Sequence, residues 1–200
     1  MTAQANLAKR YLRGEGVAPD LAEAFRWFHA ASSQGDVASS WQLGTMYQFG
    51  RGVRRNPVAA AALHLVTAKA GLAAGDVSLG DYLDELQDIA LSGNSTASQI
   101  LCEMYNLGLG VEESESLTWT WIKWAKEHCK PSGDPDEAAE VASALGFYEE
   151  WLSDETRAEG ERVLAALLRP FPWALRARPL PRVRFKRRRR SGSDGERESA

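Results

Sequence analysis

Histidine and cysteine are the residues of this chain best suited to metal binding or nucleophilic chemistry, and they are few. His29, His64 and His128 lie far apart in the sequence, and no H-x-x-x-H or C-x-x-C spacing brings ligands together. Cys102 and Cys129 are too few for a disulfide framework. We therefore expect ordinary helix histidines, small core thiols in a reducing compartment, and no bound metal or cofactor.

Acidic residues and glycines offer two further kinds of chemistry, and both have simpler interpretations. Glu112, Glu113, Glu115 and the acids between Asp81 and Asp88 fall on predicted loops and polar helix faces, where carboxylates are solvated. A catalytic pair should be partly buried, with shifted pKa values. Three G-x-G elements lack the third glycine and the G-K-[ST] of phosphate loops. No nucleophile, base and orienting residue can be assembled, so we predict that the protein is not an enzyme.

The elements that must position these residues repeat along the chain. When Tyr11, Tyr47 and Tyr105 are aligned, a leucine precedes each by four residues, and two glycines and a valine follow. These aligned positions are Leu7, Gly14, Gly16 and Val17; Leu43, Gly50, Gly52 and Val53; and Leu101, Gly108, Gly110 and Val111. Nine residues after each tyrosine comes a residue suited to a helix N-cap: Asp20, Asn56 and Ser114. Sixteen residues after each tyrosine comes a bulky apolar residue: Trp27, Leu63 and Trp121. So many matched positions indicate a repeat protein.

Each unit predicts two helices joined by a tight turn. Residues spaced by three and four before each tyrosine are small or apolar, as one face of a helix requires. The G-x-G pair ends this first helix, because glycine tolerates the left-handed backbone of a C-cap. The second helix of the first unit presents an apolar stripe, Ala24, Trp27, Ala30 and Ala31. One hairpin cannot bury that stripe alone, so the units must stack.

Two segments, NLAKRYLRGEGVAPDLAEAFRWFHAASSQG and SSWQLGTMYQFGRGVRRNPVAAAALHLVTAKAG, resemble Sel-1-like repeats, which are relatives of the tetratricopeptide repeat. A third, SQILCEMYNLGLGVEESESLTWTWIKWAKEHC, resembles a more diverged copy. The resemblance implies an all-α fold, an α/α superhelix of stacked helical hairpins. It also implies an adaptor or scaffold for protein complexes that has no catalysis of its own.

The spacing of the units sets the expected domain organisation. Tyr11 and Tyr47 are 36 residues apart, whereas Tyr47 and Tyr105 are 58 apart, so an insertion interrupts the array. Within it, LGDYLDELQDIAL predicts one acidic amphipathic helix, and two capping helices are predicted after the third repeat. We expect a repeat domain over 1–169 with repeats at about 3–35, 38–71 and 97–129, the inserted helix at about 76–92, the capping helices at about 135–169, and a tail over 170–200.

Charge divides the chain at the same point. Residues 1–169 hold 24 acidic and 14 basic side chains, a net charge of -10, whereas residues 170–200 hold 3 acidic and 10 basic, a net charge of +7. Four prolines and a polar end predict that the tail is disordered. It could solubilise the protein, bind nucleic acid or an acidic membrane, or fold back on the acidic body. Polyanion binding would use Arg184, Lys186, Arg187, Arg188, Arg189 and Arg190.

First helices usually line the concave surface of stacked hairpins, where partners bind. We expect a protein or peptide to contact the residues between the structural positions of these helices: Lys9, Arg10, Arg13, Gln42, Gln48, Glu103 and Asn106. The alternative is a regulatory module whose basic tail docks on nucleic acid or acidic membrane. No membrane span or signal peptide is evident, so a cytoplasmic location is expected.

Aromatic and thiol residues of the third unit carry two further expectations. Trp119 and Trp124 lie two residues before and three after Trp121, so all three cannot face the same interior. We expect Trp121 in the core and one of the others exposed as an interface anchor. Cys102 and Cys129 should lie further apart along the hairpin than the ~7 Å limit for a disulfide.

Overall fold

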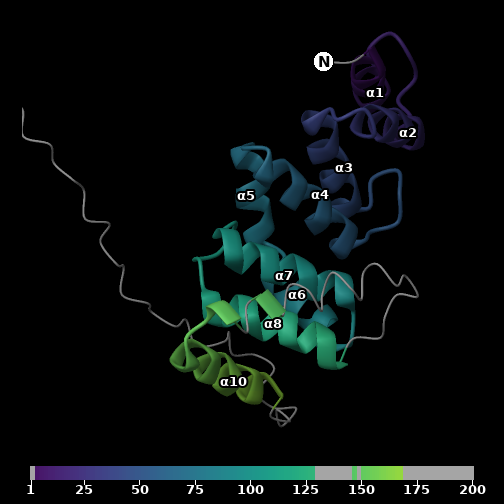
Figure 1. Ribbon diagram of the computed structural model, residues 1–200. Helices are drawn as coiled ribbons and strands as arrows, with labels where there is room; N and C mark the ends of the chain where they lie inside the picture. Colours follow the sequence, from purple (N-terminus) through teal and green to yellow (C-terminus); the bar gives the residue numbers. More distant parts are fainter. Residues whose placement is uncertain (1–2, 129–145, 148–149, 169–200) are drawn as a thin grey trace, which may run out of the picture. The chain divides into compact units, whose positions relative to one another are not determined.

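The computed structural model describes residues 3–128, 146, 147 and 150–168, and every regular element within them is a helix (Figure 1). The expected all-α fold is confirmed. The helices are α1 Ala3–Arg13, α2 Leu21–Ser32, α3 Val37–Phe49, α4 Pro57–Lys69, α5 Ala73–Gly80, α6 Leu83–Leu91, α7 Ser95–Leu107, α8 Glu115–His128 and α10 Asp154–Leu168. Of these, none is long and apolar enough to cross a membrane.

Three helix pairs form the predicted hairpins, α1 with α2, α3 with α4 and α7 with α8. The turn glycines have the predicted left-handed backbone. Gly50 and Gly108 each have φ of 66°, and their amides donate to the carbonyls of Met46 and Met104, which closes the ends of α3 and α7. A residue with a Cβ would be strained at these positions, so the glycine spacing fixes where each first helix ends.

The predicted cap residues begin the second helices. An Asp20 carboxylate oxygen accepts hydrogen bonds from the amides of Ala22 and Glu23, at 2.9 and 3.0 Å. The side-chain oxygen of Asn56 accepts from the Ala59 amide at 3.1 Å, and the Ser114 hydroxyl accepts from the Leu117 amide at 3.3 Å. Each bond satisfies a donor that the first helical turn would leave without a partner.

The inserted segment forms two short helices, where the sequence predicts one. α5 packs against α4, whereas α6 packs mainly against α7, and one straight helix cannot lie along both. The chain bends at Asp81 and Tyr82. A Cβ on Gly80 would lie 3.1 Å from the Gly110 carbonyl oxygen, so a side chain there would crowd the turn between α7 and α8. The insertion therefore links the second and third repeats through two short helices, one packed on each repeat.

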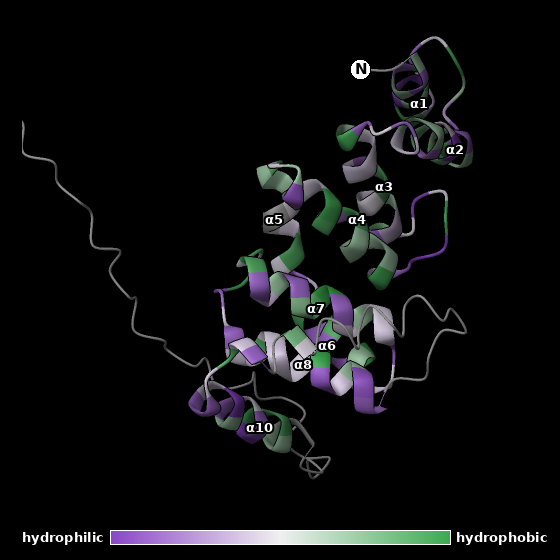
Figure 2. Cartoon of the chain, in the orientation of Figure 1, coloured by the Kyte–Doolittle hydropathy of each residue, from purple (hydrophilic) through white to green (hydrophobic). Residues whose placement is uncertain are grey.

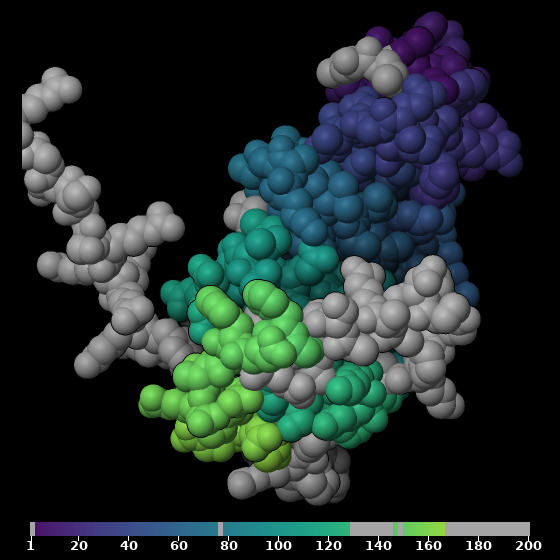
Figure 3. Space-filling view, in the orientation of Figure 1, coloured from purple at the N-terminus to yellow at the C-terminus, as the bar shows by residue number. Residues whose placement is uncertain are grey.

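α4 is the helix around which this part of the chain is arranged. It packs against α3, α5, α6 and α7, and it is hydrophobic along most of its length (Figure 2). A helix that is apolar on all sides requires neighbours on all sides. The space-filling view shows atoms of successive segments lying directly against one another (Figure 3).

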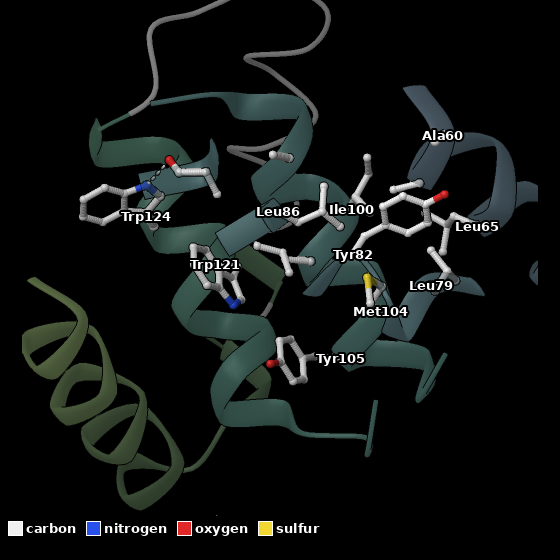
Figure 4. Packing of buried hydrophobic residues seen from close by; sticks show 14 of the residues in the cluster. Ala60, Leu65, Leu79, Tyr82, Leu86, Ile100, Met104, Tyr105, Trp121 and Trp124 are labelled. Carbon is white, nitrogen blue, oxygen red and sulfur yellow. Dashed lines mark hydrogen bonds between the residues drawn. The ribbon is translucent and has the colours of Figure 1, made fainter. Parts of the chain in front are cut away.

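The main core joins α4 to α8 and α10. It includes Tyr82, Leu86, Met104 and Trp121, all buried (Figure 4). A second core lies between α1, α2 and α3, where Phe28 is fully buried and Trp27 only partly. The sequence places Trp27 in the bulky core position, but the buried stripe of α2 is Ala24, Phe28 and Ala31, so the deepest position comes one residue later.

The expectation that one tryptophan of the third repeat is exposed is wrong, because Trp119, Trp121 and Trp124 are all buried. Trp121 and Trp124 face the main core, whereas Trp119 packs with Ile122 and Leu152 in a third cluster. α10 also covers α8 on this side, since a Cβ on Gly160 would lie 2.8 Å from the Trp119 ring. The three indoles do not all face one core, as expected, but both sides of α8 are covered.

Part of the expected C-terminal organisation lies outside the described residues. Most of the first capping helix, Cys129 and the whole tail over 170–200 belong to that part, so its predicted polyanion-binding residues have no structural account. The second capping helix is α10, which packs against α8.

Candidate functional site

The exposed sides of α1, α3 and α7 form the candidate binding surface, which we call the first-helix face. When the repeats are aligned on their tyrosines, the residues at one aligned position in different repeats form what we call a row. Lys9, Thr45 and Glu103 each lie two residues before the aligned tyrosine, and Gln48 and Asn106 lie one after it. None of these five side chains is fully buried. Residues of one row come from equivalent positions of the three repeats, so each first helix presents them on the same side.

Arg10 and Gln42 occupy other rows. Arg10 aligns with Met46 and Met104, which are buried in their repeats. In the first repeat the Arg10 side chain instead turns back to its own G-x-G turn, where Nε donates to the Glu15 carbonyl at 2.9 Å. Gln42 aligns with the buried Ile100 and is itself half-buried. Arg10 thus stabilises a turn, and Gln42 lies at the edge of the first-helix face.

Two charged residues of the expected set already have partners. Arg13 lies 3.4 Å from the Glu15 carboxylate, and both side chains are more than half exposed. Glu103 accepts from Lys69 of α4 at 2.5 Å, and these side chains are also substantially exposed. Exposed ion pairs of this kind contribute little to stability, about 0–1 kcal/mol, so an incoming charged group can replace one member at small cost.

Sequence reasoning missed two exposed apolar residues on this surface. Phe49 and Leu107, the last residues of α3 and α7, are 59% and 47% exposed. They share the row two residues after the aligned tyrosine with Arg13. Arg51 lies over the Phe49 ring, with its guanidinium carbon 5.2 Å from the ring centre. The sequence did contain a signal for them, because two repeats have an apolar residue at the end of the first helix.

The titratable residues show little sign of catalysis in the described part of the chain. No group of three or more histidine, cysteine or acidic side chains there could hold a metal ion. Burial raises the pKa of the Cys102 thiol to about 12, so this thiol is protonated and unreactive, as expected of a core cysteine. The acids Glu112, Glu113 and Glu115 are exposed, as predicted.

His64 is the exception among the histidines. His29 and His128 are exposed, whereas His64 is fully buried and neither ring nitrogen has a hydrogen-bond partner among the described residues. Burial lowers its pKa to about 4, so the ring is neutral at pH 7. The sequence predicted only an ordinary helix residue at this position. Its burial was missed because it depends on α3 and on the bend at Tyr82.

A polar hollow lies between α8 and α10, lined by Trp119, Lys123, Asp154, Arg157, Ala158 and Glu161. Lys123 lies 4.6 Å over the Trp119 ring and donates to Glu161 at 2.9 Å, and Arg157 pairs with Asp154. The hollow thus has its cations already paired with the protein's own acids, and it serves to join α10 to α8.

Comparison with known proteins finds a family similarity over the first two hairpins. The Sel1 repeat family model matches residues 2–36 and 37–72. A comparison with curated proteins found no match. Among solved structures, a protective antigen of uropathogenic Escherichia coli strains with an SLR fold is 23% identical, with a TM-score of 0.40, covering 82% of this chain and 45% of that one. A Sel1 repeat protein from Oxalobacter formigenes is 19% identical, with a TM-score of 0.39, covering 80% of this chain and 72% of that one. This chain thus spans less than half the length of the first of these structures.

Proposed function

We propose that this chain, two of whose helical hairpins are Sel1 repeats, is a non-enzymatic adaptor that binds a protein or peptide through its first-helix face. Sel1 repeats generally mediate interactions between proteins. The observation that carries the proposal is the repetition of accessible side chains at equivalent positions of α1, α3 and α7, with Phe49 and Leu107 exposed beside them. Exposed aromatic and aliphatic residues next to polar ones are typical of protein interfaces.

A matched set of truncations tests this surface. Phe49→Ala combined with Leu107→Ala removes the two exposed apolar side chains of the first-helix face. Val66→Ala, on the second helix α4, removes another that is 55% exposed and serves as the control. The partner is first identified by affinity capture with residues 1–168, and binding of the purified partner is then measured by calorimetry.

We expect the double variant to weaken binding at least about tenfold, since interface anchors typically contribute more than 1 kcal/mol. Val66→Ala should leave binding unchanged, and all variants should unfold near the wild-type temperature. Equal binding by the double variant and the wild type would contradict the proposal.

A second candidate function rests on the run of basic residues from Arg184 to Arg190. In this alternative the tail binds nucleic acid or an acidic membrane while the repeats carry a partner. Binding that depends on phosphate contacts falls steeply with salt. The full chain should then bind an oligonucleotide or anionic vesicles in 50 mM salt, lose them at high salt, and lose them entirely when residues 170–200 are removed. Absence of salt-dependent binding would contradict this alternative.

A further inference from the structure

His64 occupies a position that the other repeats fill with an apolar side chain. It lies seventeen residues after the aligned tyrosine, as do Phe28 and Ile122. Phe28 and Ile122 are both buried, and so is His64. The fold therefore requires only an apolar side chain here. A histidine at this position adds a group that can take up a proton.

The imidazole is enclosed by three residues. A Cβ on Gly44 of α3 would lie only 2.8 to 3.1 Å from three ring atoms, so the glycine gives the ring its space. Trp41 of α3 lies edge-on at a ring-centre distance of 6.5 Å, and the Tyr82 ring is stacked with the imidazole at 5.8 Å. Tyr82 stands at the bend between α5 and α6. His64 therefore joins the second repeat to the bend between α5 and α6.

Protonation of this ring finds no hydrogen-bond acceptor among the described residues. Neither ring nitrogen has a partner among the described residues, and α3 carries no charged residue. On α6, Glu85 is paired with Arg55, and on α7, Glu103 is paired with Lys69. Tyr82 is neutral, because burial raises its pKa. Asp81, exposed at the bend, is the acid whose charge favours the imidazolium, and its effect is smaller than that of burial.

We propose that His64 is a proton-sensitive latch: its neutral ring holds α5 and α6 against α3 and α4, and its protonation releases this contact. An imidazolium packed against Gly44, Trp41 and Tyr82 would be a buried charge without a hydrogen-bond acceptor among the described residues. Movement of the ring toward water and Asp81 relieves that cost, and it requires Tyr82 to leave its stacked position. The bend at Tyr82 is thus where opening begins.

The direction of the pH effect follows from the two pKa values. The ordinary histidine pKa is 6.5, and that of buried His64 is about 4. Between these values the opened or unfolded form binds the proton and the closed form does not. The closed form is therefore fully favoured above pH 6.5. The ratio of closed to open molecules falls by up to about tenfold for each pH unit below it, and levels off below pH 4.

The test compares the wild type with His64→Phe, which places the Phe28 side chain type in the equivalent position, and with His29→Gln, which changes an exposed histidine. Hydrogen exchange of α4, α5 and α6 is measured at pH 7 and pH 5 and corrected for intrinsic rates. We expect wild type and His29→Gln to exchange at least tenfold faster in these helices at pH 5, and His64→Phe to show no such increase. An equal increase in His64→Phe would overturn the proposal.

A second measurement needs no variant that might fail to fold. Proton NMR of the wild type follows each histidine ring through pH 8 to 5. We expect the closed-state signal of His64 to keep its shift and to lose intensity as the pH falls. A continuous shift of the His64 signal over this pH range, with no change in α5 and α6, would also overturn the latch.

Discussion

Trp124 shows how much one side chain contributes where two helices meet. Its indole Nε1 donates to the Ala90 carbonyl at the end of α6, at 2.9 Å (Figure 4). Its ring stacks on His128, one turn later in α8, with the ring centres 3.9 Å apart. Trp121 is equally buried, but its Nε1 has no hydrogen-bond partner among the described residues. The two tryptophans therefore separate the contribution of packing from that of a hydrogen bond.

Replacing each tryptophan by phenylalanine tests this difference. Trp124→Phe and Trp121→Phe both remove part of a buried ring, and only the first removes a hydrogen bond. A hydrogen bond of this kind contributes about 0.5–1.5 kcal/mol, whereas removal of an unpaired buried N–H relieves a cost. Urea denaturation should therefore show a larger loss of unfolding free energy for Trp124→Phe, by about 1 kcal/mol. A larger loss for Trp121→Phe would contradict the assignment.

At the scale of elements, the turns hold neighbouring hairpins together as well as ending helices. Gly52 packs so closely on the start of α2 that a Cβ would overlap the Leu21 carbonyl. Arg55, in the same turn, donates to both carboxylate oxygens of Glu85 on α6, at 2.8 and 2.6 Å. The turn between α3 and α4 thus contacts both the hairpin before it and α6 after it.

Two glycine substitutions separate backbone strain from this close packing. Gly35 and Gly52 both have positive φ, 84° and 71°, so alanine is strained at either. Gly35 has nothing within 4 Å of its expected Cβ. Gly35→Ala should cost about 1 kcal/mol, from the backbone alone. Gly52→Ala should cost about 2 kcal/mol more, because the helix must also move. Thermal unfolding measures both, and equal losses would show that the Leu21 contact is unimportant.

At the scale of the whole molecule, α10 closes the C-terminal side of the repeats. It covers Trp119, Thr120 donates to the Gly160 carbonyl at 3.1 Å, and Leu164 joins the main core. An array of stacked hairpins exposes an apolar face at its end unless a capping element covers it. α10 performs that role for α8.

Two truncations test the capping role. A chain ending at Leu168 should unfold at the wild-type temperature, because the helices and cores remain intact. A chain ending at His128 exposes Trp119 and Ile122, so it should unfold at a lower temperature and bind a hydrophobic dye. An unchanged unfolding temperature for the shorter chain would contradict the assignment.

The sequence by itself determined the repeat unit. The G-x-G turns, the N-caps at Asp20 and Asn56, and the hairpins they separate follow from local backbone chemistry, which acts within a few residues and leaves a clear pattern. Only the tertiary structure decided the rest. Whether Trp119 is exposed depends on α10, and whether the segment after Ala73 bends depends on which helices it lies along. His64 is buried because Gly44 and Tyr82, distant in sequence, close around it. The repeat alignment places His64 where the other repeats have an apolar residue, but only the tertiary structure decided which side chains enclose its ring.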